Sequence, residues 1–138
     1  MNPVSRFVSF ARTTLLVVVA LFFFLTCTHS ASAALGFVGN MYPRPGNGSP
    51  VTITEGASQT VYVQVYKGGV TESAGQGANI SCTLYYGQVS AFGGTWYNNS
   101  SQAMTFNTNV GFNDEYMATF TPAAGLWEFT ASCTDLTD

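Results

Sequence analysis

Five aromatic residues have the types and spacing that a sugar-binding surface needs. Tyr62 and Tyr66 lie in one alternating segment, Tyr85 lies in another, and Trp96 and Tyr97 are adjacent in a stretch rich in glycine and asparagine. A pyranose stacks its flat apolar face on such rings, while neighbouring amides and hydroxyls bond its hydroxyl groups. These five residues form our candidate carbohydrate-binding site.

The same aromatic residues also have a purely structural interpretation. Tyrosine is favoured in β-strands, and an outward tyrosine can pack against a neighbouring domain. Trp96 can plug the end of a β-sandwich instead of binding a ligand. Trp127, in an alternating segment after Gly125, is assigned to the core. The two interpretations differ in whether a sugar binds.

The acidic residues form no good catalytic pair. Glycoside hydrolysis needs two carboxylates across a cleft. Asp114 and Glu115 are adjacent, and neighbours in an extended chain point to opposite sides. The segment 113–115 is therefore interpreted as a turn that starts a strand. A calcium site near Asp114 and Glu115 is the alternative, because carboxylate, amide and backbone oxygens are calcium ligands, although EF-hand spacing is absent.

Nucleophilic catalysis lacks a general base. A serine or cysteine hydrolase needs a base, normally histidine, beside its nucleophile. The only histidine, His29, lies in a segment that we expect to be removed. Cys82 and Cys133 remain as an even pair in an exported chain, which predicts one disulfide. Zinc needs three or four Cys or His ligands. Apart from the calcium alternative, we therefore predict no metal, no cofactor and no enzymatic activity.

The beginning of the chain has the pattern of an export signal. Positive charges precede an apolar run over 15–25, and small residues follow it up to Ala33 and Ala34. This is the order of a secretory signal peptide with an A-x-A cleavage site. The run is about half of the ~20 residues that a spanning helix needs. Residues 1–33 are thus predicted to be a signal peptide, and no membrane span is expected after cleavage.

Cys27 raises a rival interpretation, in which a lipid is attached just after the apolar run. That signal needs a small residue directly before the cysteine and usually a leucine three positions before it. Thr26 and Phe24 occupy those positions. Cys27 is therefore interpreted as a residue lost with the signal peptide.

Cleavage would leave an acidic domain with few charges. Beyond residue 33 there are two basic residues, Arg44 and Lys67, and seven acidic ones, for a net charge of −5. Binding to nucleic acid needs clustered Lys and Arg, so we expect no nucleic-acid partner, and anionic membrane surfaces are equally unsuitable. We expect a secreted protein, extracellular or periplasmic.

Alternating segments predict an all-β fold. Val61, Val63 and Val65 share one side of a strand over 60–67, and a second alternating strand covers 79–86. The other expected strands cover 35–42, 51–54, 103–107, 116–120 and 126–133, with loops over 71–77 and 89–99 and a turn over 107–114. Six or seven short strands separated by turns are typical of a β-sandwich.

The expected organisation has three parts. Residues 1–33 are the signal peptide, residues 34–50 are an N-terminal strand or arm with a linker rich in Pro and Gly, and residues 51–138 are the sandwich module. Cys82 and Cys133 both face inward, which suits a bridge between sheets or between neighbouring strands. Because the chain stops directly after a strand, the module either ends there or is the front piece of a longer protein.

Several segments, in order, resemble a known module. They are Val61-Tyr62-Val63-Gln64-Val65-Tyr66-Lys67, Gly69-Val70-Thr71-Glu72, Gly75-Gln76-Gly77-Ala78-Asn79-Ile80-Ser81-Cys82, Phe92-Gly93-Gly94-Thr95-Trp96, Asn113-Asp114-Glu115-Tyr116, Gly125-Leu126-Trp127-Glu128-Phe129 and Cys133-Thr134-Asp135. Together they resemble an Ig-like β-sandwich module near the N-terminus of secreted bacterial, notably cyanobacterial, α-amylase-family glycoside hydrolases. Similar modules occur in other exported hydrolases, including extracellular nucleases.

The resemblance implies an Ig-like antiparallel sandwich of about seven strands that accompanies a catalytic domain and is not itself catalytic. No catalytic residue carries over, because in such enzymes the catalytic barrel follows the module. The resemblance also favours a fragment over a complete protein. The expected partners are a polysaccharide, in particular an α-glucan, or a downstream catalytic domain.

Two further functions remain as alternatives. A structural, adhesive or spacer domain would bury the same aromatic residues against another protein and bind no sugar. A small secreted enzyme would have to use carboxylates alone, so replacement of Asp114 or Glu115 by alanine would abolish turnover.

Overall fold

Seven β-strands build two antiparallel sheets in the computed structural model, which describes residues 34–44 and 50–137. The predicted signal peptide lies outside these residues. Within them there is no helix that could cross a membrane. The all-β prediction is therefore confirmed for the part of the chain that the structure describes.

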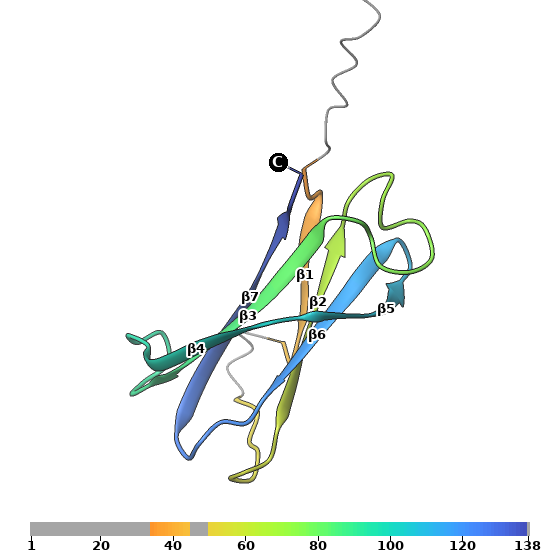
Figure 1. The fold of residues 1–138 in the computed structure, drawn as a ribbon. Coiled ribbons are helices and arrows are strands. Elements are labelled where there is room, and N and C mark those ends of the chain that lie inside the picture. Colours follow the sequence, from red (N-terminus) through yellow and green to blue (C-terminus); the bar gives the residue numbers. More distant parts are fainter. Residues whose placement is uncertain (1–33, 45–49, 138) are drawn as a thin grey trace, which may run out of the picture. The chain divides into compact units, whose positions relative to one another are not determined.

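The two sheets pack face to face as a sandwich (Figure 1). Sheet A has the order β1 (Phe37–Tyr42), β2 (Gln59–Tyr66), β6 (Asn113–Phe120) and β5 (Thr105–Val110). Sheet B has the order β4 (Tyr97–Ala103), β3 (Ile80–Val89) and β7 (Leu126–Asp135). In immunoglobulin lettering these are A-B-E-D and C′-C-F, which confirms the expected Ig-like sandwich.

Period-two alternation explains why the central strands form. Val61, Val63 and Val65 of β2 are buried, as are Tyr116 and Ala118 of β6. Their sequence neighbours point outward, because successive side chains of a strand lie on opposite faces. The inner faces of β2, β3 and β6 meet in one apolar core.

Four expected elements differ in the structure. Residues 51–54 form no strand; they lie between Pro50 and a turn in which Ala57 N donates to Thr54 O. The expected loop over 89–99 is shorter, because β4 begins at Tyr97. That strand is exposed along almost its whole length, so its polar residues show no alternation that could have predicted it.

The expected strand over 103–107 is instead the crossing point between the two sheets. Ala103 ends β4 in sheet B and Thr105 begins β5 in sheet A. Between them, Met104 is buried and its N–H donates to Cys82 O. The expected turn over 107–114 narrows to Gly111 and Phe112, since β5 and β6 extend into it.

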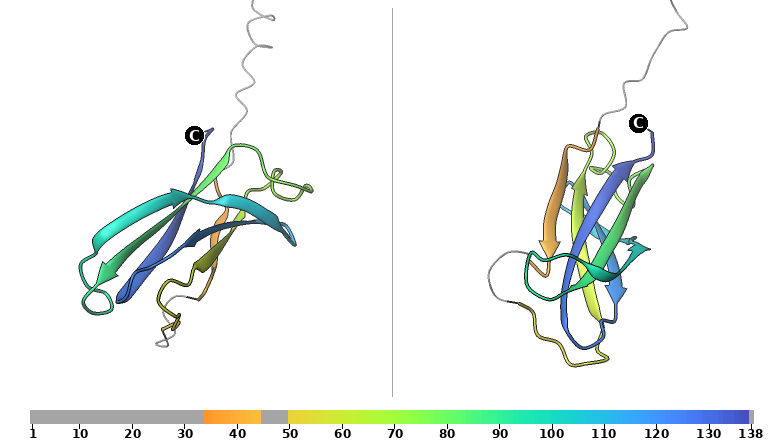
Figure 2. Two further views of the ribbon diagram at one scale, coloured as in Figure 1. Left: turned by 60° about the horizontal axis from the view of Figure 1, so that its bottom comes forward. Right: turned by 90° about the vertical axis from the view of Figure 1, so that its left-hand side faces the viewer.

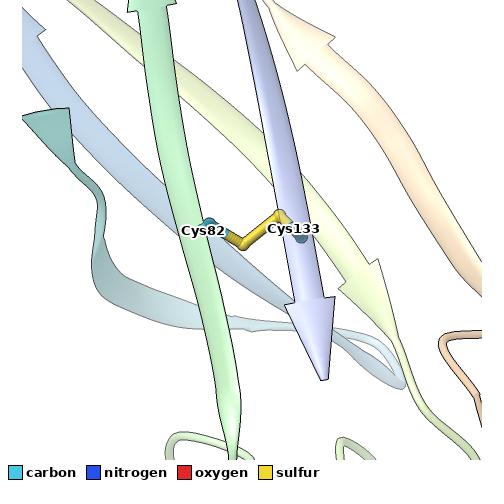
Figure 3. Close-up of a disulfide and its surroundings, with 2 residues drawn as sticks. All are labelled: Cys82 and Cys133. Carbon is cyan, nitrogen blue, oxygen red and sulfur yellow. A yellow bond between two sulfur atoms is a disulfide. The ribbon is translucent and has the colours of Figure 1, made fainter. Parts of the chain in front are cut away.

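The predicted disulfide joins Cys82 and Cys133 (Figure 3). The two cysteines are direct partners on β3 and β7, with their Cα atoms 4.1 Å apart. The bridge therefore links neighbouring strands of sheet B, which decides between the two arrangements that the sequence allowed.

Candidate functional site

The outer face of sheet A gathers aromatic rings around a strip of polar side chains. We call it the tyrosine face. Cross-strand register places its members on one side of the sheet. Its rings are Phe37, Tyr42, Tyr62 and Tyr66, and its polar strip consists of Asn40, Gln64, Asn107, Asn113 and Glu115.

Tyr42 is the most exposed ring of the tyrosine face, and its neighbour Tyr62 is half-buried. They are partners across β1 and β2, and their ring centroids are 6.4 Å apart. Tyr42 is 64% exposed, so its ring is available to a ligand. Such a pair offers an apolar surface about the size of a sugar ring on each side chain.

Tyr66 and Phe37 lie on the other side of the polar strip. A Cβ on Gly36 would lie 3.1 Å from the Tyr66 ring, and one on Gly39 would lie 2.6 Å from the Phe37 ring. The two glycines thus let both rings lie against the backbone of β1. The Tyr66 hydroxyl donates to Glu72 Oε1 over 2.6 Å, and this hydrogen bond raises the pKa of Tyr66 and lowers that of Glu72.

A chain of hydrogen bonds crosses all four strands between these pairs of rings. Gln64 Oε1 accepts from Asn40 Nδ2 at 2.9 Å and from Asn113 Nδ2 at 3.3 Å. Gln64 Nε2 donates to Glu115 Oε2 at 3.4 Å, and Asn107 Nδ2 donates to Glu115 Oε1 at 2.8 Å. The strip holds its donors and acceptors in a fixed row that sugar hydroxyls could join.

Tyr85 and Trp96 lie on the outer face of sheet B, away from the tyrosine face. Tyr85 is 42% exposed between Ser101 and Thr130. The Trp96 ring packs on Gly87, which lies two residues after Tyr85 in β3. A Cβ at Gly87 would lie 2.9 Å from that ring. The structure therefore places Tyr85 and Trp96 on one face. They are two of the five aromatic residues that the sequence analysis assigned to one site.

Trp96 has a structural partner in Glu128. Its Nε1 donates to Glu128 Oε2 at 2.8 Å, and Gly93 N donates to Oε1 at 2.6 Å. These two bonds, the Gly93 bond foremost, lower the pKa of Glu128. Glu128 thereby ties the loop over 90–96 to β7. The indole N–H is used inside the domain, which is the arrangement expected if Trp96 covers the sheet.

Tyr97 belongs to neither surface. It pairs with Gln88 across β3 and β4, next to a register shift, and is 45% exposed. The five candidate residues are thus divided: Tyr62 and Tyr66 are on sheet A, Tyr85 and Trp96 on the outer face of sheet B, and Tyr97 stands apart. They do not form one continuous site.

The structure separates the two adjacent carboxylates, as strand geometry requires. Asp114 is fully buried and accepts from Gly77 N at 2.6 Å and Asn109 Nδ2 at 2.9 Å. Burial raises the pKa of Asp114, and the Gly77 bond partly opposes that shift. Glu115 lies on the tyrosine face. Within residues 34–44 and 50–137, no three His, Cys, Asp or Glu side chains gather as metal ligands would.

Sequence reasoning missed most of the polar strip. Asn40, Asn107 and Tyr42 were not singled out as candidate site residues. Their positions depend on the register between strands far apart in sequence and on bulges in β1 and β5. The only local signal was the alternation of tyrosine with Gln64 in β2.

Comparison with known proteins adds one relative. No model of a known protein family and no solved structure matches the chain. An amylopullulanase from Thermoanaerobacterium thermosulfurigenes is 28% identical over 121 residues, which covers 73% of this chain. The chain spans 6% of the length of that protein. This weak likeness to a small part of a much longer protein is consistent with a module of a glycoside hydrolase.

Proposed function

We propose that this chain is a non-catalytic accessory module of an exported protein and that its tyrosine face binds polysaccharide, with α-glucan as the ligand. One observation carries the proposal: exposed rings of β1 and half-buried rings of β2 flank a hydrogen-bonded strip of amide and carboxylate groups. Sugar recognition needs stacking surfaces and fixed polar groups side by side.

The comparison supports the same class of ligand. A relative whose name denotes an amylopullulanase shares weak similarity with most of this chain, over a small part of its own length. An accessory module would hold a catalytic domain near its substrate, so it needs affinity and no catalytic groups. Signal-peptide cleavage, and with it secretion, is part of this proposal.

The proposal is tested by affinity electrophoresis of the chain from residue 34 onward, in gels that contain starch, pullulan, xylan or no polysaccharide. Insoluble cellulose and chitin are tested by pull-down. We expect retardation by starch or pullulan. We expect Tyr42→Ala and Tyr62→Ala each to weaken binding about tenfold, because a lost contact of about 1.4 kcal/mol changes Kd tenfold.

Tyr85→Ala is the matched control, since it removes an exposed tyrosine from the other sheet. Unchanged binding in Tyr42→Ala and Tyr62→Ala, with loss in Tyr85→Ala or Trp96→Ala, would move the site to sheet B. If the folded, disulfide-bonded domain binds none of the polysaccharides, the function is that of a spacer or protein-interaction domain.

A further inference from the structure

No strand of the described residues lies beside the outer edge of β7. Within residues 34–44 and 50–137, β7 is the edge strand of sheet B and pairs with β3. In immunoglobulin lettering β7 is strand F, and the position beside it belongs to strand G, which no described residue occupies. β1 borders the same side of the sandwich (Figure 2), yet it is hydrogen-bonded to β2 alone.

The distance across the disulfide shows which residues of β7 present backbone groups at this edge. Opposed Cα atoms lie about 4.5 Å apart in a non-hydrogen-bonded pair and about 5.5 Å apart in a hydrogen-bonded pair. Cys82 and Cys133 are at 4.1 Å, so the N–H and C=O of Cys133 point away from β3. Alternation along the unbroken β3–β7 register gives Trp127, Phe129 and Ala131 the same orientation.

The side chains of these four residues leave the core open on this side. They point inward but remain half-buried, whereas their β3 partners Cys82 and Leu84 are 1% and 0% exposed. A strand beside β7 would therefore satisfy backbone groups and cover apolar side chains at once. Both gains favour association.

β7 also lacks most of the features that normally prevent edge pairing, and its outward charged residue Glu128 is bound to Trp96 and Gly93. The strand is 10 residues long, pairs with β3 without a bulge and contains no Pro or Lys. Its exposed outward residues are Thr130, Ser132 and Thr134, which are uncharged. Natural edge strands are usually protected by charge, proline, bulges or short length.

We propose that β7 pairs with β7 of a second copy of this chain, antiparallel, with the two-fold axis at Thr130. This register matches the exposed groups to themselves: Trp127 faces Cys133 of the copy and Phe129 faces Ala131. Each large inward side chain then meets a small one. Glu128 faces Ser132, so no like charges are opposed across the axis, and Thr130 meets its own copy.

The first test is sedimentation equilibrium of the chain from residue 34 onward across a wide range of protein concentration. The wild-type chain is expected to reach a dimer. Thr130→Lys places two like charges opposite each other and should leave a monomer. Thr119→Lys, the same change on the exposed face of β6, is the matched control and should leave the dimer intact. A monomeric wild type, or a dimer that survives Thr130→Lys, would overturn the proposal.

A second pair of variants tests the register. Thr130→Cys should form a disulfide between copies under mild oxidation, because residues opposed at the axis lie within disulfide reach. Ser132→Cys should not, since it faces Glu128 of the copy. The masses of peptides from a digest without reducing agent check that Cys82 and Cys133 remain paired with each other. Cross-linking of Ser132→Cys in place of Thr130→Cys would refute the register.

The Ala131→Pro variant tests the role of the β7 edge in dimer formation without disturbing the fold of the monomer. The N–H that proline removes points away from β3, so the monomer keeps its own ladder, whereas the dimer loses a donor on each strand. Circular dichroism should show a folded chain and sedimentation a monomer. A folded Ala131→Pro variant that still dimerises would count against pairing through β7.

Discussion

Asp114 connects the loop after β2 to sheet A. Its carboxylate accepts from the backbone of Gly77 and from Asn109, and Asn109 in turn binds Ser73 O and Gly75 N. A buried, ionisable side chain is tolerated here because each oxygen has a donor. These hydrogen bonds explain how the fold tolerates the buried carboxylate.

We expect Asp114→Asn to lower the free energy of unfolding by about 1–3 kcal/mol, because an amide in this place can accept only one of the two bonds. Urea unfolding at neutral pH measures the loss. Glu55→Gln, an exposed change in a turn, should leave stability within about 0.5 kcal/mol. Equal stability of Asp114→Asn and wild type would show that the loop is held in another way.

At the level of elements, sheet B depends on one covalent link between its two longest strands. β3 and β7 pair over ten consecutive positions, and the disulfide lies near one end of that ladder. Its closed loop contains β4, β5 and β6, because Cys82 and Cys133 are 51 residues apart. The bridge therefore restricts the unfolded chain over most of the sandwich.

Replacement of both cysteines by alanine should cost about 4 kcal/mol of stability, the chain-entropy estimate for a loop of this length. Denaturant unfolding of the double variant and of the oxidised wild type gives the difference. The two proteins should have similar circular dichroism spectra before unfolding. A loss well below 1 kcal/mol would mean that the unfolded state is already compact.

Across the whole molecule, an ion pair joins the two sheets at one end. Lys67 follows β2 of sheet A and Asp135 ends β7 of sheet B, and their side chains are in contact with little exposure. The pKa of Asp135 is lowered to about 2, and the hydrogen bond from Lys67 is the largest cause of this shift. The carboxylate is thus more acidic in the folded protein than in the unfolded chain, where it titrates near ~3.9.

This difference gives the domain a defined acid response. A carboxylate with a lowered folded pKa stabilises the fold above its unfolded value, and the contribution is lost as pH falls from about 4 through 2. Urea midpoints measured over that range should fall more steeply for the wild type than for Asp135→Asn. Parallel curves for the two proteins would contradict this assignment, and Glu55→Gln provides the baseline.

The amino-acid sequence by itself determined the fold class, the strands of the core and the cysteine pair. These follow from short-range information: period-two alternation in β2, β3, β6 and β7, and the two cysteines that lie beyond the expected signal peptide. The export signal is also a local pattern, and it stays a prediction because residues 1–33 lie outside the described chain.

Only the tertiary structure decided which side chains share a surface. Tyr62 and Tyr85 look equivalent in sequence, yet they lie on different sheets, and Tyr42 joins Tyr62 only through the pairing of β1 with β2. The exposed strand β4 has no apolar alternation to reveal it. The physical reason is that alternation is set by neighbouring residues, whereas sheet membership and register are set by contacts between segments far apart in the chain.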